Sequence, residues 1–255
     1  MTNNNRSPGR ILVTLMASAV AIVGMSASAE DAPPQMAFVE AYQCTFNPDM
    51  GPADVMKARD YYVRQSEKAG IEPPDAFFWL EAIGDGPYDS VWFNVHENLA
   101  QFGAWRTANG NSDDMSDVLP RFYEVSTCTT ALGTIEPLAG EGASDDASFV
   151  SSIGCNVKDG ITEADIQDLM NHGAAVVGAM ENQPASSWLI DPFTGTGNAD
   201  YYLISVFKNA EDWGNFISEF ATSEAGQMYL RHRDTKAECA LSLWDSQTVV
   251  GSFEE

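Results

Sequence analysis

Residues 91–103, VWFNVHENLAQFG, are matched 111 positions later by residues 202–214, YLISVFKNAEDWG. In both stretches an apolar run typical of a β-strand ends at an Asn, Asn98 or Asn209, which has the side chain that starts a helix. With the same shift and no gap, 16 of the 95 residue pairs from 38/149 to 132/243 are identical. Chance would give roughly six, so the sequence indicates a tandem duplication.

The pattern inside each copy predicts the order strand, helix, strand, strand, helix, strand. In the first copy the elements are expected at residues 37–44, 52–69, 76–83, 90–96, 99–123 with a break at 109–111, and 127–134. In the second copy they are expected at residues 148–155, 163–180, 187–191, 201–207, 210–233 and 238–244. This is the split βαββαβ, ferredoxin-like motif, so the expected fold class is α+β with two ferredoxin-like units.

Four cysteines test that topology. Right-handed crossovers give the spatial strand order 4-1-3-2, which places the first and last strands side by side and antiparallel. Cys44 ends the first strand and Cys128 opens the fourth, and Cys155 and Cys239 have the same spacing. We therefore expect disulfides Cys44–Cys128 and Cys155–Cys239, which leaves no cysteine for redox catalysis.

The N-terminus predicts export. Arg6 and Arg10 precede an apolar stretch at residues 11–24, and an Ala-Ser-Ala cleavage site ends at residue 29. The expected division is a signal peptide at 1–29, a first repeat at 30–135, a linker at 136–147 and a second repeat at 148–255. We expect a periplasmic or secreted location and no segment that spans a membrane.

The charge of the chain narrows the class of partner. The sequence has 13 Lys and Arg against 37 Asp and Glu, and removal of residues 1–29 takes away two cations, which leaves 11 − 37 = −26. Such a field repels nucleic acid and anionic lipid, so neither is an expected partner. The spacing of the cysteines and histidines matches no zinc motif, and the sequence predicts neither a metal nor a cofactor.

One stretch resembles a known group of proteins. Residues 206–213, VFKNAEDW, with Phe216 and residues 223–225, are similar to the strand-to-helix passage of antibiotic biosynthesis monooxygenase-like domains, and residues 95–98 with Phe102 and Trp105 repeat it. The chain thus resembles the dimeric α/β-barrel superfamily, in which two ferredoxin-like units pack their sheets face to face. The resemblance implies a pseudo-dimeric α/β-barrel within one monomeric chain.

The same resemblance carries expectations about activity. Members of the superfamily bind small, often aromatic or polyketide-like molecules between sheet and helices. Some oxidise them without a cofactor, some isomerise lactones and some handle haem. No proximal haem ligand can be assigned in this sequence.

Differences between the copies suggest a site in the first. Trp92, Asn94 and His96 lie on one face of a predicted strand, where the second copy has Leu203, Ser205 and Phe207. A histidine near a carboxylate is suited to acid or base catalysis. A hydrogen-bonded or half-exposed histidine at a strand end is the structural alternative. The residues expected to complete a polar and aromatic pocket are Glu40, Tyr42, Trp79 and Glu81.

Three classes of function follow. The leading hypothesis is an exported binding protein for a small apolar or aromatic molecule, held between sheet and helices of the first repeat. The alternatives are a cofactor-independent monooxygenase or isomerase that uses His96, and a non-catalytic assembly module.

The charge also generates a prediction about stability. Self-repulsion of about 26 uncompensated negative charges weakens the compact state. Salt screens it over about 10 Å at 0.1 M. We expect the melting temperature to rise as NaCl is increased to several hundred millimolar, as calorimetry would record. A flat response would mean that the acidic groups are locally compensated.

Overall fold

Eight strands pair edge to edge and close on themselves in the order β1-β3-β2-β8-β5-β7-β6-β4, with every pairing antiparallel. The computed structural model describes residues 37–83, 88–140, 148–195 and 199–250. The strands are β1 (Ala37–Phe46), β2 (Asp75–Ile83), β3 (Ser90–His96), β4 (Ser126–Gly140), β5 (Phe149–Val157), β6 (Ser186–Gly195), β7 (Tyr201–Phe207) and β8 (Ala237–Val250).

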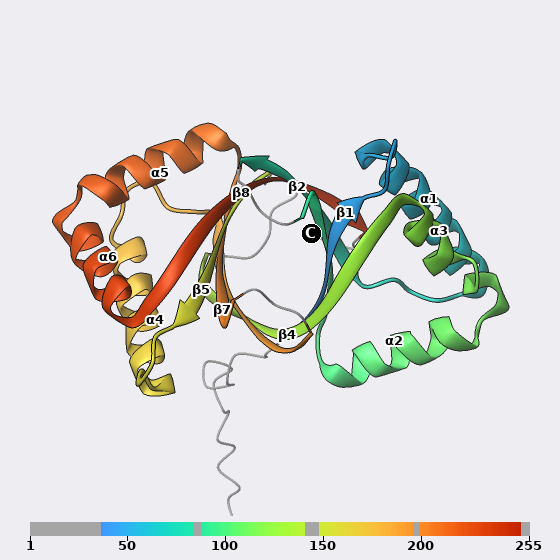
Figure 1. Ribbon diagram of the computed structural model, residues 1–255, viewed down its shortest axis with the longest axis horizontal. Coiled ribbons are helices and arrows are strands. Elements are labelled where there is room, and N and C mark those ends of the chain that lie inside the picture. The colour runs from blue at the N-terminus through green and yellow to red at the C-terminus, as the bar shows by residue number, and fades with distance from the viewer. Residues whose placement is uncertain (1–36, 84–87, 141–147, 196–198, 251–255) are drawn as a thin grey trace, which may run out of the picture. The chain divides into compact units, whose positions relative to one another are not determined.

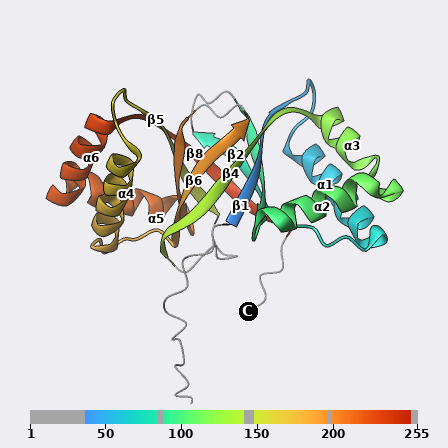
Figure 2. The ribbon, with the colours of Figure 1, turned by 90° about the horizontal axis from the view of Figure 1, so that it is seen from below.

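Helices cover two opposite sides of this barrel (Figures 1 and 2). On one side lie α1 (Pro52–Ala69), α2 (Leu99–Asn111), a 3-10 turn (Asp113–Met115) and α3 (Val118–Val125). On the other lie α4 (Glu163–Gly178), α5 (Ala210–Thr222) and α6 (Glu224–Lys236). We call β1–β4 with the first group the first half, and β5–β8 with the second group the second half.

The fold is α+β as expected, but the expected pair of ferredoxin-like units that pack their sheets face to face is wrong. β2 pairs with β8 and β4 pairs with β6, so the two halves share one closed sheet. The cause is the length of β4 and β8, which run to Gly140 and Val250, beyond the strand ends expected at residues 134 and 244. The added residues pair with strands of the opposite half and leave neither half an open edge. β4 thereby also continues past the boundary expected at residue 135.

Other expectations about local structure are confirmed. Disulfides join Cys44 to Cys128 and Cys155 to Cys239, and each pair sits directly opposite in the β1–β4 or β5–β8 ladder. Asn98 and Asn209 cap their helices: the side-chain oxygen of each accepts a hydrogen bond at 2.9 Å from the backbone N–H three residues on. β3 and β7, like α2 and α5, have bounds 111 residues apart, although the duplication itself stays a prediction from the sequence.

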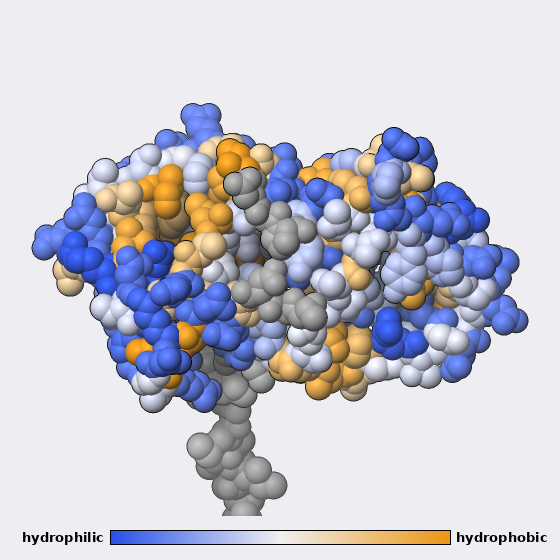
Figure 3. Space-filling model, in the orientation of Figure 1, coloured by the Kyte–Doolittle hydropathy of each residue, from blue (hydrophilic) through white to orange (hydrophobic). Residues whose placement is uncertain are grey.

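Alternation along the strands divides their side chains between the barrel interior and the helices. Val39, Phe93 and Trp244 belong to the cluster inside the barrel. Their neighbours on the other face pack against the helices. Figure 3 shows hydrophilic side chains over the outer ends of the molecule and hydrophobic ones nearer the barrel.

Some expectations fall outside the described residues. These are the signal peptide at 1–29, the hairpin turn at 84–87 and residues 141–147 of the linker. Within the described ranges, no helix has the length and apolar character needed to cross a membrane.

The β4–β6 seam makes a prediction about stability. A Cβ at Gly133 would lie 2.7 Å from the Asp191 carbonyl oxygen across the seam. A Cβ at Gly103, inside α2, would meet nothing within 4 Å. Gly133→Ala should therefore lower the free energy of unfolding by about 1–3 kcal/mol, because the seam must move apart. Gly103→Ala should raise it by about 0.5–1 kcal/mol. Urea denaturation compares the two, and equal effects would show that the seam is not tightly packed.

Candidate functional site

A cavity of about 450 Å³ lies in the first half, between the outer face of its strands and its helices. The wall on the strand side includes Tyr42, Phe78, Trp92 and Asn94. The wall on the helix side includes Tyr62, Trp105, Arg106, Asn109, Val118 and Phe122. Its described lining thus combines seven aromatic side chains with many polar groups, a mixture that can bind and orient a small molecule.

The second half shows why the cavity exists. Phe220 and Tyr229 fill the corresponding space there, with their rings 5.8 Å apart and both side chains buried. The residues 111 positions earlier are Asn109 and Val118, which are smaller and line the cavity. The first half thus has smaller side chains at these two positions, while Tyr62 replaces Gly173, the residue that lies against the Tyr229 ring.

A buried carboxylate organises the polar end of the cavity. Glu40 on β1 is 2% exposed, and its Oε2 accepts a hydrogen bond at 3.1 Å from Asn94 Nδ2 on β3. Asn94 Oδ1 in turn accepts a hydrogen bond at 2.8 Å from Trp92 Nε1. Arg106 Nη1 on α2 lies 3.6 Å from Glu40 Oε1. These contacts compensate a charge that would be costly to bury alone.

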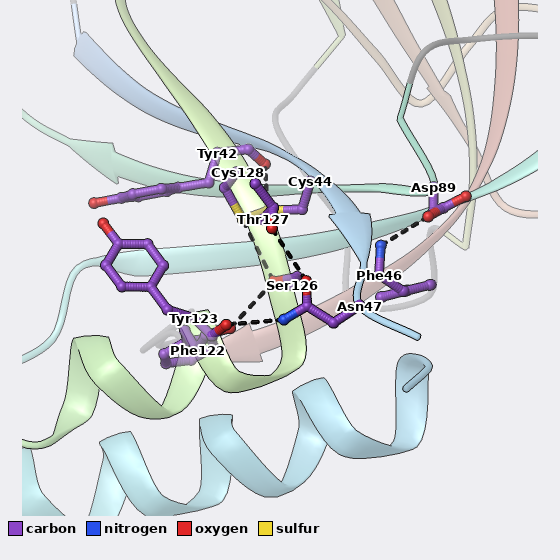
Figure 4. The surroundings of a disulfide bond; sticks show 10 residues. All are labelled: Tyr42, Cys44, Phe46, Asn47, Asp89, Phe122, Tyr123, Ser126, Thr127 and Cys128. Atoms are coloured by element: carbon purple, nitrogen blue, oxygen red, sulfur yellow. Dashed lines mark hydrogen bonds between the residues drawn. A yellow bond between two sulfur atoms is a disulfide. The ribbon is translucent and has the colours of Figure 1, made fainter. Parts of the chain in front are cut away.

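Tyr42 connects this network to the cavity. It lines the cavity and hydrogen-bonds through its hydroxyl to Glu40, two residues away on the same face of β1. Burial, followed by the nearby Glu40 carboxylate, raises the pKa of Tyr42 well above its usual value. Tyr42 is therefore a neutral hydroxyl that donates to a carboxylate. Figure 4 shows the Tyr123 ring beside that of Tyr42, with the hydroxyl ends near each other.

The Cys44–Cys128 disulfide also lines the cavity (Figure 4). It lies at the same end as Ser126, whose hydroxyl is 3.4 Å from Cys128 Sγ. The disulfide fixes β1 against β4 beside Tyr42. A structural cross-link thus forms part of the wall of the site.

His96 lies on the same strand face but does not line the cavity. It is 1% exposed and packs against Phe102 and Trp105, with ring centroids 5.3 and 5.4 Å away. Neither ring nitrogen has a hydrogen-bond partner among the described residues. Burial lowers the pKa of His96 to about 4. The Trp105 ring, which does line the cavity, stands next to it.

Strand alternation separates two of the expected site residues from the others. Phe78 of β2 points to the helices, and Trp79 therefore points into the barrel, where it packs against Phe93 at 4.2 Å. Glu81 has the same parity as Trp79. The structure thus brings together Glu40, Tyr42, Trp92 and Asn94, and places Trp79 and Glu81 elsewhere.

Sequence reasoning missed the helix side of the site. Trp105, Arg106 and Asn109 lie on α2. The sequence of this helix has no clear apolar face, and none of its residues is fully buried. One signal was available. Arg106 is one of 13 cations in a strongly acidic chain, and Asn109 stands where the second copy has Phe220.

The cavity was also tested for haem, because some members of the superfamily that the sequence resembles handle it. Haem iron takes His, Met, Tyr or a Cys thiolate as its protein ligand. No histidine lines this cavity, its two cysteines form a disulfide, and the Met115 sulfur faces the Ser66 hydroxyl at 3.8 Å. The Tyr42 hydroxyl is engaged with Glu40, and burial raises the pKa of Tyr62 to about 12, which opposes the phenolate form that binds iron. Tyr123 also lines the cavity but is exposed. The described lining thus offers no buried haem ligand, and no step below is routed through haem.

The closed antiparallel barrel with helices on two sides is similar in fold to several solved structures. Similar solved structures include candidate monooxygenases from Fusobacterium nucleatum (13% identity, TM-score 0.57, covering 85% of this chain and 96% of that one) and Lactobacillus acidophilus (11%, 0.53, 84% and 97%). An anthrone oxidase-like protein is also similar, with 11% identity and a TM-score of 0.53 over 85% of this chain and 94% of that one. At these identities the likeness shows the fold alone. Searches with the sequence find no matching family profile and no matching curated protein.

Burial of His96 predicts how stability depends on pH. Its pKa is about 4 in the folded protein and about 6.5 when unfolded, so between these values the unfolded chain takes up the proton more readily. The free energy of unfolding therefore has its full contribution from neutral His96 above pH 6.5. This contribution is lost as the pH falls toward 4, by about 3 kcal/mol in all. His96→Phe copies Phe207, the residue 111 positions on. The variant should lose less stability than the wild type between pH 7 and 4.5, measured by urea denaturation. Parallel losses would contradict the buried neutral state.

Proposed function

We propose that this chain is an exported, oxidase-type enzyme that binds a small aromatic molecule in the first-half cavity and oxidises it with O₂. The observation that carries the proposal is a cavity of about 450 Å³ in which the Tyr42 hydroxyl is backed by the buried Glu40 carboxylate. The names of three structural neighbours, monooxygenase and anthrone oxidase-like, favour the same class of reaction, although another neighbour is named a chlorite dismutase. Two disulfides support a periplasmic or secreted location.

The proposed substrate carries an acidic C–H or O–H group on an aromatic ring system. Tyr42 would accept this proton while passing its own to Glu40, so the pair acts as a relay to a base shielded from water. Arg106 and Asn94 line the cavity beside them. Arg106 is the group placed to stabilise the negative charge that develops on substrate oxygen.

The overall reaction balances without an added reductant. An activated CH₂ group loses its two hydrogens and gains one oxygen atom as C=O, while the second atom of O₂ leaves with both hydrogens as water. The substrate supplies all the electrons that O₂ accepts. In this scheme His96 has no catalytic role, because it lies behind Trp105 and outside the cavity lining.

A binding protein without turnover is the second candidate. The aromatic side chains of the lining and the size of the cavity favour this reading as much as they favour an enzyme. The single chain closes its own barrel, so we propose that it acts as a monomer in either case.

Anthrone and O₂ provide the test. We expect the wild type to consume O₂ with anthrone, and Tyr42→Phe to reduce the rate by about 100-fold or more with affinity largely kept. Glu40→Gln should have a comparable effect. Oxygen consumption and product absorbance measure turnover, and calorimetry measures binding. Tyr61→Phe removes a hydroxyl outside the cavity lining and is the matched control.

The outcomes separate the readings. Binding of anthrone without turnover would support the binding protein and reject the oxidase. Turnover that survives in Tyr42→Phe would reject the relay. Absence of both binding and turnover would remove anthrone-like molecules from the proposal.

A further inference from the structure

The interior of the barrel contains a second cavity, distinct from the one beneath the helices. Its volume is about 610 Å³, and all eight strands contribute side chains to its wall. An eight-stranded barrel is just wide enough to be filled by its own side chains or to hold one small ligand. Here the side chains leave space, because several wall positions are small: Ala41, Ala131, Gly133, Ser152 and Gly154.

Aromatic rings form one part of this wall. Trp79 packs against Phe93 at 4.2 Å and against Trp244 at 6.5 Å between ring centroids, and all three side chains are buried. Tyr88 and Tyr202 also line the cavity. Five aromatic side chains therefore line this one cavity.

The charged and amide groups of the wall gather at one end. Asn156 and Glu238 are directly opposite each other in the β5–β8 ladder, and Gln43 is on β1. Glu238 is exposed to solvent and is the one carboxylate of the described lining. None of the described lining residues is Lys or Arg. The negative charge of the described lining thus lies at this end of the cavity.

We propose that the barrel interior binds a small organic cation with an aromatic body. The faces of Trp, Tyr and Phe attract cations, most strongly where water is excluded. The ring system of the ligand would pack against Tyr202, which pairs with Gly154 next to Ala240, and its charge would point toward Glu238, two residues from Ala240 on β8. The first-half cavity differs in its charged groups, because Arg106 and Asp113 both line it. The barrel site does not depend on the proposed oxidase activity.

A pair of probes of nearly equal shape tests the charge preference. 1-Methylquinolinium is a cation, and 1-methylnaphthalene is its neutral counterpart. We expect the full chain to bind the cation about tenfold more tightly, as measured by titration calorimetry. Glu238→Gln should weaken binding of the cation several-fold and leave the neutral probe unchanged. Glu124→Gln makes the same change in charge outside the cavity lining and should alter neither.

Two filling variants test the location. Ala41→Phe places a ring in the barrel interior and should abolish binding of the cation. Asn109→Phe fills the first-half cavity, as Phe220 does in the second half, and should leave that binding intact. Thermal unfolding checks that each variant folds. If Ala41→Phe does not fold, the effect of Glu238→Gln on binding of the cation still tests the proposal.

Three results would overturn the proposal. They are equal affinity for both probes, binding that survives in folded Ala41→Phe, and binding that is lost in Asn109→Phe instead. The last result would place the ligand in the first-half cavity. Anthrone turnover in the same variants is a separate readout, so failure of one proposal leaves the other intact.

Discussion

The pairing of β2 with β8 and of β4 with β6 is the constraint on which the rest of the structure depends. Backbone N–H and C=O groups at a sheet edge need partners, and two separate four-stranded sheets would each expose two such edges. Closure supplies these partners and creates an inside and an outside. The inside becomes the aromatic-lined barrel interior, and the outside becomes two platforms covered by helices.

The two platforms share one framework and differ in what fills them. The second half buries Phe216, Phe220 and Tyr229 in a continuous core. The first half has two smaller clusters with a cavity between sheet and helices. Overpacking and underpacking both cost stability, so an unfilled cavity beside a buried carboxylate is a feature that folding alone does not favour. This is the physical reason to look for function in the first half.

The sequence was a good guide wherever the decisive interaction was local or repeated. The bounds of β3 and β7, the caps Asn98 and Asn209, and both disulfides could be predicted from spacing and side-chain type. Barrel closure could not, because it depends on pairing between halves, and the end of β4 contains Pro137 and Gly140, which are typical of a linker. Strand alternation correctly placed Trp92 and Asn94 on one face of β3, where they form a hydrogen bond. The sequence did not show which residues of β2 face the helices, and Trp79, expected in the pocket, faces the barrel interior instead. The Arg106 side of the site depends on how a weakly amphipathic helix docks, which its sequence does not specify.

The two disulfides span successive, non-overlapping parts of the chain, residues 44–128 and 155–239. A chain that enters an oxidising compartment N-terminus first can therefore lock its first half before the second has emerged. At that moment β2 and β4 have no partners from β8 and β6. The intermediate with the first disulfide formed is thus a half-barrel with two unpaired edge strands, β2 and β4. These edges can pair with another copy of the chain. For a chain exported as proposed above, slow delivery of residues 149–250 would lengthen that exposure and lower the yield of folded protein.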